Sequence, residues 1–130
     1  MIVGIGVDIV DVRRVDALLA RHRERFLKRV FTEAEAEYAG RSVRAAERLA
    51  GRFAVKEALL KALGTGKSRG ILWRDVETVP GPLGRPETRL YGNALKYMER
   101  LGGERVHVSV THDGGKAVAF VILEGPGERR

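Results

Sequence analysis

The sequence contains no cysteine, no glutamine and a single asparagine. Without cysteine it forms neither a disulfide framework nor a thiolate metal site, and a reducing, cytoplasmic location is consistent with this composition. Aromatic residues make up only 6% of the chain, which leaves few side chains on which nucleic-acid bases could stack. No apolar run reaches the ~18 residues of a membrane-spanning helix. Nor does a basic segment precede the apolar start, so we expect no membrane segment and no secretory signal.

Positive charge is what the sequence has in excess, with 24 Lys and Arg against 17 Asp and Glu and a net charge of +7. Such a balance indicates an acidic partner, which is a nucleic acid, an anionic lipid, a phosphorylated small molecule or an acidic protein. Most of the basic residues are arginine, which suits bidentate phosphate recognition, although GC-rich coding gives the same bias. The length of 130 residues and the hydrophobic fraction of 44% predict one small domain, which an oligomer would stabilise further.

Apolar periodicity and turn residues predict an α+β domain in which a mostly antiparallel sheet packs against a long helix. The domain spans residues 1–124, and residues 125–130 are expected to form a flexible tail. We expect strands at residues 1–10, 75–79, 87–91, 105–111 and 116–123. We expect helices at residues 12–22, 33–38, 43–63 and 93–101.

Local signals mark several ends of these elements. Asp11 is expected to cap the first helix, and Thr32 with Glu35 forms a capping box before the second. Ser42 and Gly64 are the expected start and stop signals of the long helix. A hairpin turn over residues 112–115 joins the last two strands.

Glu57 is the first candidate for chemistry, because it lies beside the apolar stripe of the long helix. A carboxylate there is partly desolvated and needs a cation, a hydrogen-bond donor or a metal. An ordinary ion pair with Lys61, one helical turn later, is the alternative. Asp8 ends an apolar strand and either has a functional role or caps the next helix. Together the two carboxylates suit Mg²⁺, which takes one or two carboxylates plus phosphates and water.

Four basic residues at four-residue spacing form a second stripe on the long helix: Arg44, Arg48, Arg52 and Lys56. This stripe is either a solvated face or a phosphate-binding track that the glycine-containing loop at 64–68 extends. The loop is no Walker A motif, because a helix precedes it and Lys61 stands where that motif needs glycine. The three histidines lack zinc-binding spacing, and His112 either donates to a phosphate or braces the hairpin turn.

Three segments together resemble the motifs of bacterial holo-(acyl-carrier-protein) synthases, which are 4′-phosphopantetheinyl transferases. They are residues 1–9, residues 52–62 continued by 64–66, and residues 106–112. Phe31 and Thr32, with Glu35 and Tyr38, are similar to the region between the first two motifs. The resemblance extends from residue 1 to about residue 123, and the order and separation of the three motifs make it specific.

The resemblance implies the phosphopantetheinyl transferase fold and a homotrimer with active sites at the subunit interfaces. It implies transfer of 4′-phosphopantetheine from coenzyme A to a serine of apo acyl carrier protein, for fatty-acid biosynthesis, with Mg²⁺ as cofactor. Asp8 and Glu57 would hold the metal, and both would act in catalysis with Lys61. The implied coenzyme A contacts are Arg44, Arg52, Lys61, Gly64, Thr65 and His112. The implied carrier-docking residues are Arg14, Arg25 and Arg29.

Two other functions compete with this interpretation. A basic nucleic-acid-binding module is favoured by the net charge, but the scarcity of aromatic residues and the absence of a known binding signature weigh against it. A noncatalytic coenzyme A-binding protein is the second, and binding without turnover would distinguish it from the enzyme. We therefore expect an enzyme with neither nucleic acid nor membrane as its partner.

Overall fold

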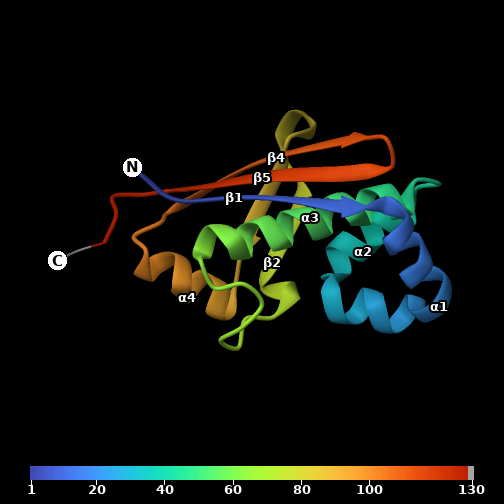
Figure 1. The fold of residues 1–130 in the computed structure, drawn as a ribbon, viewed down its shortest axis with the longest axis horizontal. Coiled ribbons are helices and arrows are strands. Elements are labelled where there is room, and N and C mark those ends of the chain that lie inside the picture. Colours follow the sequence, from blue (N-terminus) through green and yellow to red (C-terminus); the bar gives the residue numbers. More distant parts are fainter. Residues whose placement is uncertain (129–130) are drawn as a thin grey trace.

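The computed structural model describes residues 1–128, so the expected tail at 125–130 lies partly outside the described residues. Figure 1 shows a sheet lying along one side of a long central helix, α3, with the other helices on the other side of that helix. The helices are α1 (Val12–Val30), α2 (Glu33–Gly40), α3 (Ala45–Leu63) and α4 (Gly92–Arg100), with short 3₁₀ turns η1 (Trp73–Asp75) and η2 (Pro82–Gly84). The strands are β1 (Ile2–Asp11), β2 (Val76–Pro80), β3 (Pro86–Leu90), β4 (Arg105–Asp113) and β5 (Lys116–Glu124).

The strands form two antiparallel sheets where the sequence predicts one. The larger sheet has the order β1-β5-β4, and β2 pairs with β3 in a separate hairpin. Asp8 is opposite Ala119 in the β1–β5 pair, and His112 is opposite Ala117 in the β4–β5 pair. The α+β class and the antiparallel pairing are confirmed. No helix within residues 1–128 is both long and apolar enough to cross a bilayer.

β1 packs directly against α3 because two glycines remove side chains from their contact. A Cβ at Gly4 would overlap the carbonyl oxygen of Ala62, and a Cβ at Gly6 would overlap that of Ala58. Side chains alternate along a strand, so Asp8 points to the same side as these glycines. The glycines that follow the amino terminus are therefore a packing requirement, and they bring the strand that carries Asp8 against α3.

The first helix is longer than predicted. It continues through a kink at His22, where φ is −140° and ψ is 40°, and it ends at Val30. The stretch after the kink is rich in Arg and Lys, and its apolar residues are Phe26, Leu27 and Val30. Phe26 and Val30 nevertheless reach the core, and tertiary packing holds this second half.

The long helix begins at Ala45, so the expected start at residue 43 and the cap at Ser42 are wrong. The Ser42 hydroxyl instead accepts a hydrogen bond from the Arg44 N–H at 3.0 Å, before the helix begins. The predicted stop is confirmed, because Gly64 has a φ of 77° and closes the helix.

The last hairpin is tighter than predicted. Gly114 and Gly115 alone form its turn, with φ values of 57° and 76°, as a two-residue primed turn requires. His112 therefore lies within β4 and does not start the turn.

Candidate active site

A pocket of about 240 Å³ lies where β1, α3 and the loop after α3 meet. β1 contributes Asp8, which faces α3 because of the strand alternation described above. The lining residues are Asp8, Glu57, Leu60, Lys61, Gly66, Lys67 and Trp73. The two acidic residues singled out in the sequence, 49 positions apart, thus share one pocket with two lysines.

The carboxylates of the pocket are incompletely satisfied. Lys61 Nζ donates to Asp8 Oδ1 at 2.8 Å and to the Val7 carbonyl at 3.1 Å. Asp8 Oδ2 is buried and finds no hydrogen-bond partner within the described part of the chain. Burial, together with the adjacent Asp8 carboxyl, raises the pKa of Glu57 to about 7. One buried carboxylate oxygen of the pocket is therefore left without a hydrogen-bond donor among residues 1–128.

Lys61 has a different partner from the one expected of an i, i+4 pair. It forms its ion pair with Asp8 across the α3–β1 contact, and the hydrogen bond to Asp8 raises the pKa of Lys61. The alternative of an ordinary Glu57–Lys61 helix pair does not describe the observed contact. Lys61 stays charged at neutral pH and faces the pocket opening.

These residues fit a divalent cation. An unpartnered buried carboxylate oxygen beside a second carboxyl with a raised pKa is the donor set that a cation would satisfy. Residues 1–128 contain no cluster of three or more His, Cys, Asp or Glu side chains placed to hold a metal. Two carboxylates with the remaining positions left to phosphate and water is the arrangement typical of Mg²⁺.

The loop after α3 does not offer the backbone cradle expected from its glycines. The N–H groups of Gly64, Thr65 and Gly66 all bond to carbonyls of the last turn of α3. The half-buried side chain of Thr65 and the exposed side chain of Lys67 remain as the groups with which this loop could contact a phosphate.

The basic stripe on α3 is neither one solvated face nor one continuous track. Arg44 is exposed at the start of the helix, whereas Lys56 is fully buried. Arg48 and Arg52 lie over the Tyr38 ring, with guanidinium carbons 4.5 and 4.6 Å from its centroid. Four-residue steps gain about 40° each around a helix, so Lys56 is about 120° away from Arg44.

His112 lies far along α3 from the pocket. Its Nε2 is 2.9 Å from the carbonyl oxygen of Glu47, and its ring packs over Gly51. α3 has 19 residues, or about 28 Å at 1.5 Å per residue. Arg44 and His112 therefore lie near one end of α3, and Lys61, Gly64 and Thr65 lie at the other.

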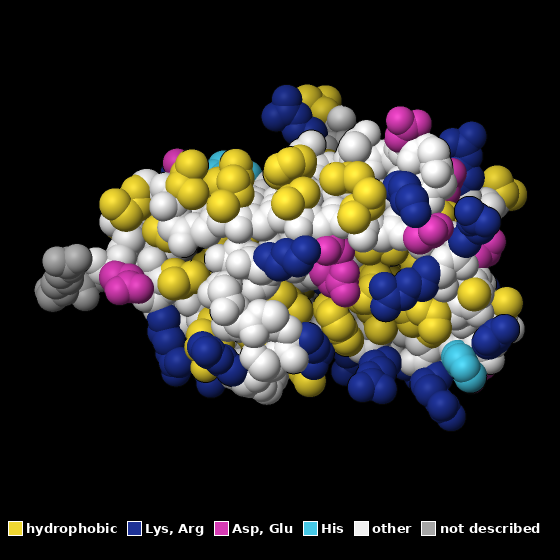
Figure 2. Space-filling view, in the orientation of Figure 1, with side chains coloured by type: hydrophobic (Ala, Val, Ile, Leu, Met, Phe, Trp, Pro, Cys, Tyr) yellow, Lys and Arg dark blue, Asp and Glu magenta, His cyan; other side chains and the backbone are white. Residues whose placement is uncertain are grey.

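The arginines of α1 form a basic surface beside the pocket, visible in Figure 2 as the dark blue side chains over α1. Arg14 is closest to the pocket, because its guanidinium carbon is 5.8 Å from the Phe53 ring centroid and its charge lowers the pKa of Glu57. Arg25 and Arg29 are exposed on the second half of α1, beyond the kink.

Trp73, Lys67 and Leu60 line the pocket but are absent from the predicted site residues. Trp73 is the only tryptophan of the chain, and the Lys67 ammonium lies 5.7 Å from its ring centroid. A single tryptophan directly after a glycine-rich basic loop is a signal that could have drawn attention to this position.

Comparison with known proteins identifies the class that this pocket and fold define. Residues 4–121 match the 4′-phosphopantetheinyl transferase superfamily, and the chain belongs to this family. A holo-(acyl-carrier-protein) synthase of Geobacter sulfurreducens is 48% identical over 126 residues, which cover 97% of this chain and 100% of that protein.

Solved structures agree with this assignment. The holo-(acyl-carrier-protein) synthase of Neisseria meningitidis superposes with a TM-score of 0.84 at 37% identity, over 95% of this chain and 99% of that one. The Bacillus anthracis synthase, solved in complex with CoA (3′,5′-ADP), has a TM-score of 0.78 at 35% identity, over 96% and 98% of the two chains. The family predicted from the three sequence motifs is thereby confirmed.

Proposed function

We propose that this chain transfers 4′-phosphopantetheine from coenzyme A to a serine of apo acyl carrier protein, releasing adenosine 3′,5′-bisphosphate. The observation that carries the proposal is the pocket in which Asp8 and Glu57, with one carboxylate oxygen unpartnered, adjoin Lys61 and Lys67. The near full-length similarity to holo-(acyl-carrier-protein) synthases supports the same reaction.

Asp8 and Glu57 are the residues that would hold Mg²⁺ in this pocket. When bound, the cation would offset negative charge on the phosphates of coenzyme A. Lys61 would remain paired with Asp8 on one side and donate to a phosphate oxygen on the other. This arrangement keeps a positive charge at the pocket opening, where a phosphate enters.

In the transfer step the serine oxygen forms a bond to the β-phosphorus, and the bond from that phosphorus to the bridging oxygen of adenosine 3′,5′-bisphosphate breaks. The serine proton needs an acceptor. Glu57, a carboxyl group in the same pocket, is suited to accept it directly or through a water. Most of the acceleration then comes from positioning and charge stabilisation, as in other phosphoryl transfers.

The division of the family-implied residues between the two ends of α3 supports a homotrimer. One coenzyme A at the pocket of one copy would reach Arg44 and His112 from a neighbouring copy, with Arg52 in the middle of α3 between the two groups. The outer face of β1 and β5 is apolar yet exposed, and Figure 2 shows its hydrophobic side chains as a yellow row along the upper side. The members of this row are Ile5, Val7, Ile9 and Phe120. Such a patch is typical of an interface between copies. Since the family resemblance implies three copies, size-exclusion chromatography with light scattering should give a trimer mass.

The carrier protein is proposed to dock on α1 through Arg14, Arg25 and Arg29. These residues are exposed, and the first of them adjoins the pocket. A basic helix steers an acidic partner and raises its association rate. The serine of a carrier bound there would face the pocket from the α1 side.

The proposal is tested by mixing the protein, apo carrier protein, coenzyme A and Mg²⁺ and measuring the mass of the carrier. We expect a gain of one phosphopantetheine group, which EDTA prevents. A carrier whose acceptor serine is replaced by alanine is the control and should gain nothing. An unchanged mass of the wild-type carrier would overturn the proposal, and coenzyme A binding without transfer would identify a binding protein instead.

A further inference from the structure

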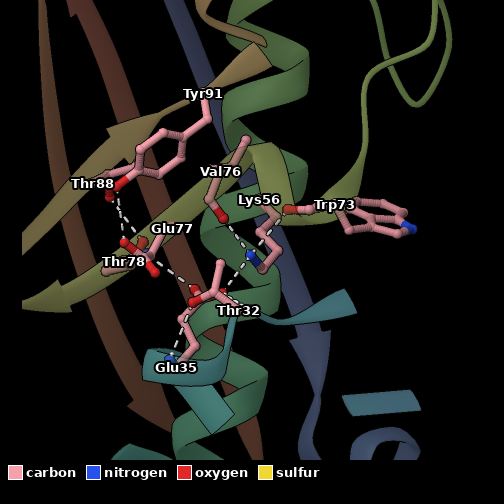
Figure 3. Close-up of polar contacts among 9 residues, drawn as sticks. All are labelled: Thr32, Glu35, Lys56, Trp73, Val76, Glu77, Thr78, Thr88 and Tyr91. Carbon is pink, nitrogen blue, oxygen red and sulfur yellow. Dashed lines mark hydrogen bonds and ion pairs between the residues drawn. The ribbon is translucent and has the colours of Figure 1, made fainter. Parts of the chain in front are cut away.

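One ion pair lies wholly inside the molecule, behind the active-site pocket. Lys56 of α3 and Glu35 of α2 are joined at 2.7 Å, and both side chains are 0% exposed. Figure 3 shows them pointing toward each other between α2, α3 and β2. A buried pair costs free energy through desolvation unless its remaining hydrogen-bonding capacity is also satisfied.

The ammonium of Lys56 uses all three of its protons. Besides Glu35, its Nζ donates to the carbonyl oxygen of Trp73 at 3.1 Å and to the carbonyl oxygen of Val76. Both carbonyls belong to the segment that leads from the loop after α3 into β2. Figure 3 shows this segment passing over the end of the lysine side chain. Lys56 therefore attaches that segment to the middle of α3.

The carboxylate of Glu35 is equally saturated. Its Oε1 accepts from the Thr32 N–H at 3.0 Å as well as from Lys56, and its Oε2 accepts from the Thr78 N–H at 3.0 Å. The same side chain thus completes the capping box of α2 and holds the backbone of β2. The pair joins α2, α3, η1 and β2 at a single point.

This point lies next to the active site without being part of the pocket lining. Trp73, whose carbonyl Lys56 binds, presents its ring to the pocket and packs on Phe53 with centroids 5.1 Å apart. Glu57 directly follows Lys56 on α3. The interior pair therefore holds the backbone of Trp73 beside the part of α3 that carries Glu57.

We propose that Glu35 and Lys56 are positioning residues for the transfer reaction, which they serve by holding Trp73 as the apolar wall of the pocket. With Leu60, the indole faces the carboxylates and lysines of the same pocket. Such a pocket fits a molecule that joins a phosphate to an uncharged chain, as coenzyme A does. This inference rests on the proposed function for its substrate, and on the hydrogen bonds of Figure 3 for its geometry.

Stability alone does not account for this pair. Replacing a buried ion pair by apolar side chains of similar volume is often neutral or stabilising. Apolar side chains in these places would form no hydrogen bonds, so they would bind neither the carbonyl of Trp73 nor the N–H of Thr78. The specific function of the pair is therefore the placement of these two backbone groups.

Trp73 makes the test direct, because it is the only tryptophan and its fluorescence reports on the pocket wall alone. In Glu35→Gln, which removes the charge at nearly constant volume, we expect stronger acrylamide quenching of Trp73. We also expect kcat/KM for coenzyme A to fall by about 10- to 100-fold, as misplacement by about 1 Å does elsewhere. The KM for the carrier should stay near the wild-type value. Leu123→Ala, in the buried face of β5 and outside the pocket lining, is the control for lost stability, with unchanged quenching and kinetics.

A double-mutant cycle separates action through Trp73 from a general effect. If Glu35 acts through the indole, adding Glu35→Gln to Trp73→Ala should lower kcat/KM no further than Trp73→Ala alone. Additive losses would overturn the proposal, as would wild-type quenching and kinetics in Glu35→Gln. If Glu35→Gln does not fold, Trp73→Ala decides alone, and wild-type transfer by that variant would overturn the proposal.

The outcome is distinguishable from failure of the proposed function. If the wild-type protein transfers nothing, the proposed function is wrong. The quenching of Trp73 in Glu35→Gln would still decide whether the buried pair positions the indole. If the wild type transfers and Glu35→Gln is indistinguishable from it, only the positioning role is wrong.

Discussion

Two acid–lysine pairs lie close together on α3, and their lengths are nearly equal. Glu35–Lys56 measures 2.7 Å and Asp8–Lys61 measures 2.8 Å. In the interior pair every carboxylate oxygen and every ammonium proton has a partner. In the pocket pair Lys61 is 57% exposed and one oxygen of Asp8 has no partner within residues 1–128. The distance between the two charges therefore does not distinguish a structural pair from a functional one. The presence of an atom without a hydrogen-bond partner does.

The largest effect is expected when one of the two carboxylates of the pocket is removed. Asp8→Ala or Glu57→Ala should lower Mg²⁺-dependent transfer by about 100- to 1,000-fold. Each variant removes a carboxylate that would hold the positive charge of Mg²⁺ beside the reacting phosphate. The fold should persist, since neither carboxylate completes a buried network. The carrier mass assay and circular dichroism together check this. Glu99→Ala, an exposed carboxylate on α4, is the matched control, and full activity in either pocket variant would remove that residue from the metal site.

The second prediction compares the two lysines directly. Lys56→Met leaves the Glu35 carboxylate buried without its cation, which should cost about 3–5 kcal/mol in the free energy of unfolding. Lys61→Met removes an exposed partner and should leave the free energy of unfolding almost unchanged while transfer falls. Urea unfolding followed by circular dichroism measures both variants. Equal losses of stability would show that the two pairs do not differ as described.

The third prediction concerns the basic residues of α1, of which Arg14 lies beside the pocket. Arg14→Glu should raise the KM for the carrier about tenfold with little change in the KM for coenzyme A, because it reverses charge where the acidic partner docks. Added salt should narrow this difference, since exposed charges are screened. Steady-state kinetics at two salt concentrations measure the effect. Arg105→Glu, exposed on β4, is the control, and equal changes in both KM values would argue against docking on α1.

The smallest expected effect comes from Glu57 in the metal-free protein. Its pKa of about 7 lies above the ordinary value of 4.5, so the folded state binds more protons than the unfolded state between these values. Stability of the wild type therefore falls as pH rises through this window. Glu57→Gln should lack this decline and exceed the wild type by about 1 kcal/mol at pH 8, after allowance for solvent screening. At pH 4 the two proteins should be alike.

Thermal unfolding in EDTA at pH 4 to 8 measures this difference. Mg²⁺ at pH 8 should then raise the Tm of the wild type more than that of Glu57→Gln, because binding to the folded state stabilises it. Parallel pH profiles for the two proteins would contradict the raised pKa.

Features that depend on neighbours in sequence were predictable. The stop at Gly64, the capping box of Thr32 with Glu35, and the partial burial of Glu57 all follow from spacing along the chain, and each is confirmed. The family was predictable from the three motifs. Asp8 and Glu57 were singled out by such arguments, and the structure places both in one pocket.

Features that depend on the three-dimensional partner were not predictable in this way. Lys56 reads as part of an exposed basic stripe, since nothing within one helical turn shows that Glu35 and two carbonyls meet it in the core. Trp73 was missed because its place in the pocket wall depends on a loop folding back over α3. The predicted end of helix α1 at His22 was wrong for a related reason, because the core contacts that hold Phe26 in the helix lie beyond the kink.

The two glycines of β1 fix the distance between this strand and α3, because backbone contacts backbone there. Where Gly4 and Gly6 touch α3, no side chain can change rotamer and alter the gap. The separation of the acidic groups downstream is consequently a property of two backbones, insensitive to most core substitutions. A larger cation would need a wider gap between β1 and α3, which varying Asp8 alone does not provide. Gly6→Ala would widen this gap, because the added Cβ would overlap the carbonyl oxygen of Ala58 and force the strand away from the helix.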